Sequence, residues 1–257
     1  MIRLDNVTKV YPDGTEAVKE MSFEVGKGEL CVLLGTSGCG KTTTVKMINR
    51  LIPITGGNIY IDGVDNAKTD ENELRRNIGY AIQEIGLFPH MTVGQNIETV
   101  PALKGWPKAK RKERAEQLLE LVGMAPREFI GKYPSELSGG QCQRVGVARA
   151  LGADPPVLLM DEPFGAIDPI TRARLQDEFL NIQQEIKKTI IFVTHDIFEA
   201  IKIGDKIVLM KDGRLVQYDT PTSLLCRPKN KFVEDFFGAD LAVKKALEEI
   251  TQRRQSG

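Results

Sequence analysis

The sequence predicts an α/β fold with a parallel sheet, an antiparallel β layer at its N-terminal end and an inserted helical region. Near-continuous apolar runs at 30–34, 157–160 and 190–193 are typical of strands buried on both faces of a parallel sheet. Amphipathic helical patterns separate these runs, and short alternating stretches open the chain. Repeated alternation of strand and helix indicates the α/β class.

The opening stretches, at 2–11, 17–25 and 58–63, alternate apolar and polar residues and end at glycine-containing turns such as Asp62-Gly63. This pattern predicts antiparallel strands. Farther along, two helices are expected. The first spans 41–51, with Val45, Ile48 and Leu51 on one face, and the second carries the apolar positions Leu175, Phe179, Ile182 and Ile186.

Strand signals stop between about residues 91 and 145. Ala115, Leu118, Leu119 and Val122 form a helical stripe there that Gly123 ends, so we expect a helical insertion within a domain spanning 1–237. Residues 238–257 are expected to form a polar helical tail.

Composition narrows the classes of function. The 257 residues contain 35 Lys+Arg and 35 Asp+Glu, so the formal net charge is zero. A chain with this charge lacks the broad positive field that nucleic-acid binding requires. No apolar run approaches the roughly 18 residues of a membrane span, and the charged N-terminus does not resemble a secretory signal. The four cysteines show no CxxC pairing, so a reducing cytoplasm is expected.

Residues 35–42, Gly-Thr-Ser-Gly-Cys-Gly-Lys-Thr, match the pattern GxxxxGK[ST] between a buried strand and a helix. Glycines let successive backbone N–H groups converge on a phosphate, and the helix N-terminus adds partial positive charge. Lys41 is then expected to reach the β- and γ-phosphates, and the Thr42 hydroxyl to bind Mg²⁺. The alternative, a plain glycine-rich turn, leaves the agreement of eight positions and both flanks unexplained.

Two adjacent carboxylates, Asp161 and Glu162, end the apolar run that starts at Val157. Successive side chains of a strand point to opposite faces, so the two acids have different roles. Asp161 is expected to hold Mg²⁺, while Glu162 polarises the attacking water as a general base. The alternative is that both are solvated charges.

The segment Leu137-Ser138-Gly139-Gly140-Gln141 opens a further helix. Together with the two preceding motifs it resembles the signature segment of the ABC ATPases. The resemblance covers residues 1 to about 237 and implies a P-loop NTPase (RecA-like) core that binds ATP and Mg²⁺. It also implies a head-to-tail homodimer, in which Ser138, Gly139, Gly140 and Gln141 meet the γ-phosphate bound by the other subunit. A simple helix N-cap at Ser138 is compatible with that role.

The resemblance also assigns the remaining site residues. ATP would be bound by Tyr11, Gly35, Thr36, Ser37, Gly38, Cys39, Gly40, Lys41, Thr42 and Thr43. Gln83 would contact Mg²⁺ and couple the nucleotide to a membrane partner, Asp168 would cross the dimer interface, and His195 would contact the γ-phosphate. Without the family, Tyr11 and His195 would be better interpreted as packed core residues.

The loop Phe88-Pro89-His90-Met91 is apolar and aromatic, which is typical of a contact surface. In the family this region meets an integral membrane permease. Several stretches, including Arg75–Tyr80 and Gly86–Thr92, are most similar to importers of quaternary-amine osmoprotectants (glycine betaine, carnitine or choline), which also use an external substrate-binding protein. The resemblance implies a peripheral location on the cytoplasmic face of the membrane and no nucleic-acid partner.

Three alternatives remain at this point. The chain could serve an importer of another small solute, or act on nucleic acid, although the coiled-coil insertion or tandem second half typical of that class is missing. It could also be a nonhydrolysing module, although Lys41, Glu162 and His195 are all present. Importers of this group often carry a regulatory CBS pair after about residue 238. The 257 residues contain no such pair, so the sensor is either lacking or lies beyond them.

Overall fold

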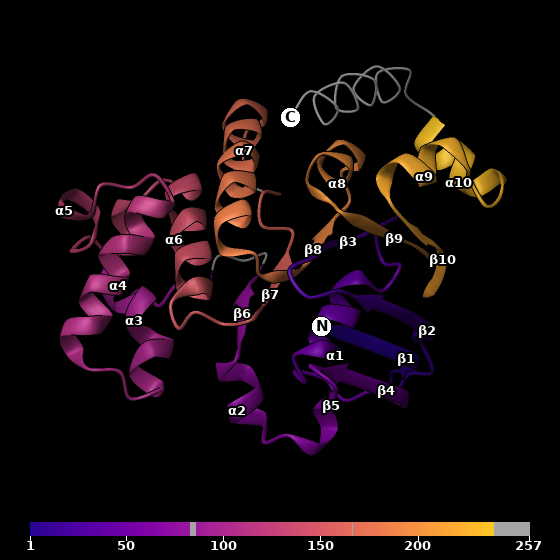
Figure 1. Ribbon diagram of the computed structural model, residues 1–257, viewed down its shortest axis with the longest axis horizontal. Helices are drawn as coiled ribbons and strands as arrows, with labels where there is room; N and C mark the ends of the chain where they lie inside the picture. Colours follow the sequence, from indigo (N-terminus) through magenta and orange to yellow (C-terminus); the bar gives the residue numbers. More distant parts are fainter. Residues whose placement is uncertain (83–85, 166, 239–257) are drawn as a thin grey trace. The chain divides into compact units, whose positions relative to one another are not determined.

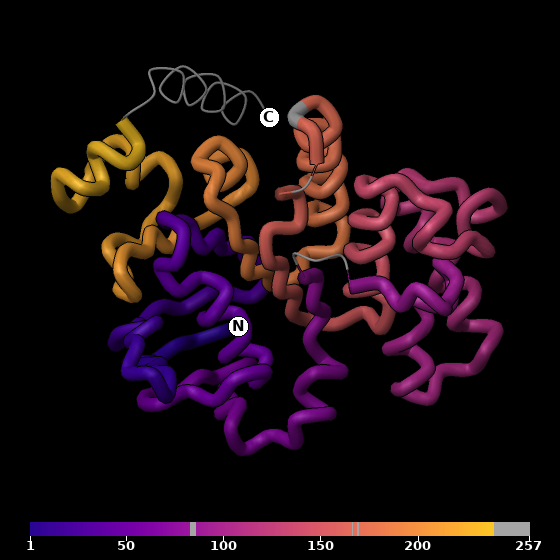
Figure 2. The backbone as a smooth tube through the Cα atoms, turned by 180° about the vertical axis from the view of Figure 1, so that it is seen from behind, coloured from indigo at the N-terminus to yellow at the C-terminus, as the bar shows by residue number. Residues whose placement is uncertain are grey.

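The computed structural model describes residues 1–82, 86–165 and 167–238 (Figure 1). The chain divides into two compact units, one formed by Met1–Asp65 with the chain from Ile191 onward, the other by Asn66–Ile190. Segments from opposite ends of the sequence meet in the first unit: in Figure 2 the indigo strands lie with the orange C-terminal segments.

The first unit contains strands and short helices from both ends of the chain. Its strands are β1 (Ile2–Val10), β2 (Glu16–Val25), β3 (Leu30–Gly35), β4 (Gly56–Ile61), β5 (Val64–Asp65), the larger part of β8 (Thr189–Thr194), β9 (Lys206–Lys211) and β10 (Arg214–Asp219). Its helices are α1 (Lys41–Ile48), α8 (Ile197–Ile203), α9 (Pro221–Cys226) and α10 (Lys231–Gly238).

The N-terminal strands form an antiparallel sheet in the order β2-β1-β4-β5. Ile2 lies opposite Val25 on one side and Ile61 on the other, and Ile2, Leu4 and Val7 are buried. A two-residue turn joins β4 to β5, in which Asp62 (φ 49°) and Gly63 (φ 81°) both adopt positive φ, the geometry that tight hairpins require. The predicted antiparallel layer is confirmed.

The other strands of this unit follow the order β10-β9-β3-β8. β3 pairs in parallel with β9, and β10 pairs antiparallel with β9. Every residue of β3 is buried, as its apolar run predicts, and α1 and α8 pack against it. A central strand covered on both faces provides a firm base for the loop that leaves its carboxyl end.

The second unit is mainly helical. It contains η1 (Asn66–Lys68), α2 (Glu71–Arg76), β6 (Ile78–Ala81), α3 (Val93–Leu103), α4 (Lys108–Leu121), α5 (Pro126–Phe129), η2 (Pro134–Glu136), α6 (Gly139–Leu151), β7 (Val157–Asp161) and α7 (Pro169–Ile186). β6 and β7 pair in parallel, and α6 contacts α3, α4 and β6.

The predicted apolar stripes lie on buried faces of this unit. Ala115, Leu118 and Leu119 of α4 are buried, as are Leu175, Phe179 and Ile182 of α7. Gly123 ends the first stripe at φ 67°. Residues 91–145 contain α3, α4, α5, η2 and the start of α6, and their status as an insertion into the 1–237 domain stays a prediction.

The structure differs from the sequence prediction at the end of α1. The helix ends at Ile48 and not at residue 51, because Arg50 adopts φ 49° and turns the chain out of the helix. Leu51 is therefore 44% exposed and does not share the buried face of Val45 and Ile48. The predicted tail after Gly238 lies outside the described residues. Across the ranges that the structure describes, no helix is long and apolar enough to cross a membrane.

Candidate functional site

The loop after β3, Gly35–Thr42, approaches neighbouring backbone closely enough to exclude side chains. A Cβ at Gly35 would lie 2.2 Å from the Met210 carbonyl oxygen, and one at Gly40 would lie 2.3 Å from the Ala17 carbonyl oxygen. Gly40 also adopts φ 102° at the N-cap of α1. The glycines are therefore needed for this path of the chain, which is here called the glycine loop.

Lys41 lies inside the glycine loop and is only 6% exposed. Its ammonium donates to the carbonyl oxygens of Gly35 (2.8 Å) and Thr36 (2.9 Å) and lies 3.8 Å from the Cys39 sulfur. The first turn of α1 carries no acidic residue, so helix dipole and ammonium add without a neutralising partner in that turn. This donor set fits a polyphosphate.

Two more predicted site residues, Tyr11 and His195, belong to this unit. The Tyr11 hydroxyl is 3.4 Å from the Thr43 hydroxyl on α1, and the Lys9 ammonium lies 5.2 Å from the Tyr11 ring centroid. His195 is exposed and follows β8, the neighbour of β3 in the sheet.

In the second unit, the adjacent acids at the end of β7 have different environments. Asp161 is 3% exposed, and its charge adds to burial in raising the pKa of Tyr80 on β6. Glu162 is half-buried and adopts φ 48°, and its carbonyl accepts the Gly165 N–H at 3.1 Å. A non-glycine residue in the left-handed region of backbone conformation costs about 1–3 kcal/mol, and such residues occur both in turns and at active sites.

The signature segment begins α6 with a complete capping box. The Ser138 hydroxyl accepts the Gln141 N–H at 3.3 Å, and the Gln141 side chain accepts the Ser138 N–H at 2.9 Å. Gly139 is exposed, and a Cβ there would meet nothing within 4 Å; one at Gly140 would meet only Thr171 at 4.0 Å. Packing among the described residues therefore does not require either glycine.

Asp168 caps α7 by accepting the Thr171 N–H at 3.0 Å, and hydrogen bonds from the Thr171 backbone and side chain lower the pKa of its carboxyl. Sequence reasoning missed Ile170 beside it, which is 86% exposed although apolar. An apolar residue in the first turn of a helix, two positions after the predicted site residue Asp168, is the signal that could have identified Ile170.

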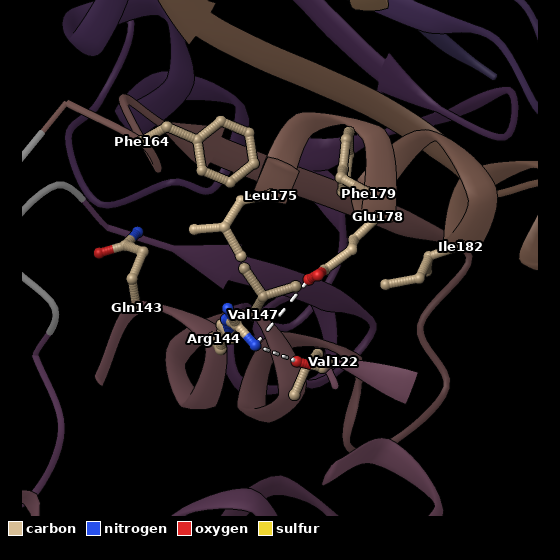
Figure 3. Close-up of a pocket in the computed structure, with 9 residues that line it drawn as sticks. All are labelled: Val122, Gln143, Arg144, Val147, Phe164, Leu175, Glu178, Phe179 and Ile182. Carbon is tan, nitrogen blue, oxygen red and sulfur yellow. Dashed lines mark hydrogen bonds and ion pairs between the residues drawn. The ribbon is translucent and has the colours of Figure 1, made fainter. Parts of the chain in front are cut away.

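A cavity of about 30 Å³ separates α6 from α7, and Figure 3 shows its lining. Phe164, Leu175 and Phe179 close one side, while Arg144 extends toward Glu178 (3.9 Å) and donates to the Val122 carbonyl (3.3 Å). This volume suits a water molecule and is too small for a nucleotide. The cavity belongs to the packing of α6 and carries no separate site.

The apolar loop between β6 and α3 is held by residues that sequence reasoning did not single out. Asn96 of α3 is fully buried and accepts the Phe88 N–H at 2.8 Å. Arg149 of α6 donates to the Gly86 carbonyl at 2.6 Å. Phe88 itself is 41% exposed. An asparagine within the first helical turns after the apolar loop, eight residues after Phe88, is the signal that the sequence offered for Asn96.

The structure thus places the described site residues in two groups. Tyr11, the glycine loop with Thr43, and His195 belong to the first unit. Asp161, Glu162, the signature segment and Asp168 belong to the second. Gln83 lies outside the described residues.

The donor set for Mg²⁺ can be judged by its chemistry. Within the described part of the chain, no three His, Cys, Asp or Glu side chains gather into a metal site on their own. Mg²⁺ commonly takes one or two protein oxygens together with phosphate oxygens of a substrate. The Thr42 hydroxyl and the Asp161 carboxylate are oxygen ligands of that kind.

The family model described as ABC transporter matches residues 18–165. The chain belongs to the ABC transporter family. It is 56% identical over 244 residues to the glycine betaine/carnitine/choline transport ATP-binding protein OpuCA of Bacillus subtilis (strain 168), a match that covers 95% of this chain and 64% of that protein. The chain therefore spans less than two thirds of the length of that relative.

Two other relatives extend the comparison. The glycine betaine uptake system ATP-binding protein YehX of Escherichia coli (strain K12) is 49% identical over 245 residues, covering 95% of this chain and 79% of that protein. The dimeric ATP-binding cassette MJ0796, solved in a post-hydrolysis state with ADP and Pi, has a TM-score of 0.78 and 35% identity, covering 86% of this chain and 99% of that one. The predicted fold class, a parallel sheet with helices and an antiparallel β subdomain, is confirmed.

Proposed function

We propose that the chain is the ATP-hydrolysing subunit that powers import of a quaternary-amine osmoprotectant through a partner permease. The observation that carries the nucleotide part is the glycine loop folded around the buried Lys41 ammonium, with Gly35 and Gly40 at positions that admit no side chain. The cargo rests on relatives 54–56% identical whose names specify glycine betaine, carnitine or choline transport.

In this proposal the glycine loop binds the phosphates of ATP and Tyr11 stacks on the adenine. Thr42, Asp161 and Gln83 hold Mg²⁺, which when bound would neutralise phosphate charge. Glu162 takes the proton of the attacking water, and its fixed, half-buried position after β7 suits that task. His195 contacts the γ-phosphate.

The proposed assembly is a head-to-tail homodimer. Gly139 and Gly140 leave the start of α6 without side chains, although no contact among the described residues requires this. Another molecule can therefore approach the helix N-terminus. Ile170, next to Asp168, exposes an apolar side chain that a second copy could bury. Two copies would bind two ATP molecules between them.

The permease is proposed to contact the loop Phe88–Met91, which places the chain peripherally at the cytoplasmic face of the membrane. The Phe88 side chain is exposed while Asn96 fixes its backbone, so an apolar surface is presented in a defined position. An external substrate-binding protein would take part indirectly. No nucleic-acid partner is proposed, because the chain has no net charge.

The test is copurification with the permease followed by uptake of labelled glycine betaine, carnitine and choline. Phe88→Asp should abolish both copurification and uptake. Leu103→Asp, a matched change at another exposed apolar residue (59%) of the same unit, should leave both intact. Uptake of a different solute alone would keep the ATPase assignment and overturn the cargo. A nucleic-acid partner in place of the permease would overturn the transport function.

A further inference from the structure

The loop from Gly86 to Thr92 is anchored to α3 by one buried side chain. Asn96, with no exposed surface, accepts the Phe88 N–H at 2.8 Å and donates to the carbonyl oxygens of Phe88 (3.2 Å), Met91 (3.1 Å) and Thr92 (3.0 Å). A buried amide with its polar atoms satisfied holds the local backbone in one arrangement. These hydrogen bonds therefore couple the position of the loop to that of α3.

A second anchor comes from α6. The Arg149 guanidinium donates to the Gly86 carbonyl at 2.6 Å, and its central carbon lies 5.9 Å from the centroid of the Phe88 ring. Burial lowers the pKa of this guanidinium, which nevertheless stays charged. The planar guanidinium can donate to a carbonyl and lie against an aromatic ring at once, which a lysine ammonium cannot do equally well.

The helix that carries Arg149 begins at Ser138 of the signature segment. Arg149 lies eleven positions after Ser138, which corresponds to about 17 Å along the axis of α6. α6 is one uninterrupted helix that contacts α3, α4 and β6, and Arg144 links it to Glu178 of α7 (Figure 3). A displacement at its N-terminus therefore moves its C-terminal turn as well.

We propose that Arg149 is a positioning residue that ties the loop 86–91 to the signature helix, so that nucleotide contact at Ser138 displaces the proposed permease-binding surface. This inference rests on the proposed function, which assigns the γ-phosphate to Ser138 and the permease to Phe88. It adds a defined physical connection between Ser138 and Phe88, which consists of α6 and the Arg149 side chain near the end of that helix.

The test follows the loop directly with a spin label. The full chain carries Cys226→Ser, which removes the exposed thiol while the other three cysteines are buried, and His90→Cys as the labelled position. The chain also carries Glu162→Gln, which is expected to slow hydrolysis and so to retain bound ATP. Adding ATP and Mg²⁺ should change the spectrum of the label. Arg149→Met should reduce that change, because only the Asn96 anchor to α3 then remains, while ATP affinity and melting temperature stay the same.

Arg174→Met is the matched control, because Arg174 of α7 is 64% exposed and pairs with Glu178. It should leave the response of the label intact. If Arg149→Met lowers the melting temperature, Arg149→Lys is the deciding variant. A lysine can still reach the Gly86 carbonyl but lacks the planar guanidinium, so a reduced response of the label is expected.

A full response in Arg149→Met, or in Arg149→Lys where that variant decides, would overturn the inference. So would the lack of any ATP response with Arg149 present, because the loop would then not sense the nucleotide. The proposed function fails separately. A chain whose label responds through Arg149, but which supports no uptake with the permease, would retain this connection and lose the transport role.

Discussion

At the scale of single residues, neighbouring groups of the same chemistry differ because the backbone places them differently. Asp161 ends a strand and is buried, whereas Glu162, the next residue, leaves the strand in a left-handed conformation and is half-buried. The sequence could predict two roles from strand alternation. It could not predict the positive φ of Glu162, which belongs to a turn in which the Gly165 N–H donates to the Glu162 carbonyl.

Glu162→Gln should lower the rate of ATP hydrolysis by about 100- to 10,000-fold, the usual effect of losing a general base. Nucleotide binding should persist, since the glycine loop is unaltered. Steady-state hydrolysis and equilibrium binding of ATP are the two measurements. Glu20→Gln is the matched control, because Glu20 is also a glutamate at φ 48° but lies on β2. Hydrolysis near the unsubstituted rate would remove Glu162 from the proposed chemistry.

Tyr11→Ala should weaken ATP binding by roughly 1–3 kcal/mol, the size of base stacking on an aromatic ring. Tyr11→Phe should be nearly neutral, because the ring remains and only the long 3.4 Å contact with Thr43 is lost. GTP should bind as well, since stacking does not distinguish the bases by hydrogen bonds. Calorimetric titration of the three chains provides the comparison, and equal affinity in Tyr11→Ala would make Tyr11 a packing residue.

At the scale of elements, the sequence predicts where helices begin better than where they end. The start of α1 at Lys41 follows from the glycine pattern, whereas its end depends on Arg50 entering the left-handed region without a glycine to announce it. The strands β3, β7 and β8 are evident because burial on both faces leaves only apolar residues. Such patterns can be recognised within a short window of sequence, so these elements could be predicted.

Contacts between distant segments could not be predicted in the same way. Asn96 and Arg149 hold one loop from two helices that are far apart in sequence, and neither belongs to a motif. Their roles depend on the packing of α3 on α6, which no periodicity specifies. The motifs therefore predict the chemistry of the candidate site, and the tertiary structure supplies the residues that position it.

Gly139→Ala should separate stability from assembly. A Cβ there meets nothing within 4 Å among the described residues, so alanine should raise the free energy of unfolding. The gain should be smaller than the roughly 0.5–1 kcal/mol of a helix interior, because Gly139 is the first residue of α6. The same methyl group would obstruct a phosphate or a second subunit at the helix N-terminus. ATP-induced dimerisation, followed by size exclusion in the Glu162→Gln background, should therefore weaken.

Gly131→Ala is the control for that substitution, because its Cβ also meets nothing within 4 Å but lies away from the signature segment. Its dimerisation should match that of the parent chain. Undiminished dimerisation of Gly139→Ala would mean that the bare start of α6 serves no partner.

At the scale of the whole molecule, the parts of the candidate site are divided between two units that the chain forms from separate stretches. The glycine loop precedes α1 in the first unit, and the signature segment begins α6 in the second. A related cassette has been solved as a dimer with ADP and Pi. These observations support a site that takes its glycine loop from one subunit and its signature segment from the other.

Mixed dimers test that arrangement, with Ser138→Arg blocking the signature segment and Glu162→Gln removing the base. Suppose one subunit carries Ser138→Arg and its partner carries Glu162→Gln. In a head-to-tail dimer both changes then fall in the same site, and the other site stays intact. If both changes are in one subunit paired with an unsubstituted one, each site receives one defect. The first mixture should therefore hydrolyse ATP and the second should not, in preparations purified through two different affinity tags.

A site completed within a single chain predicts the reverse order. The mixture with one change in each subunit would then lack any intact site, while the doubly changed subunit would leave its unsubstituted partner fully active. The two arrangements thus differ in the sign of the comparison and not only in its size, so partial cooperativity between the sites cannot conceal the result. Full hydrolysis by a strictly monomeric preparation would likewise exclude the shared site, because a monomer cannot bring a second signature segment to its own glycine loop.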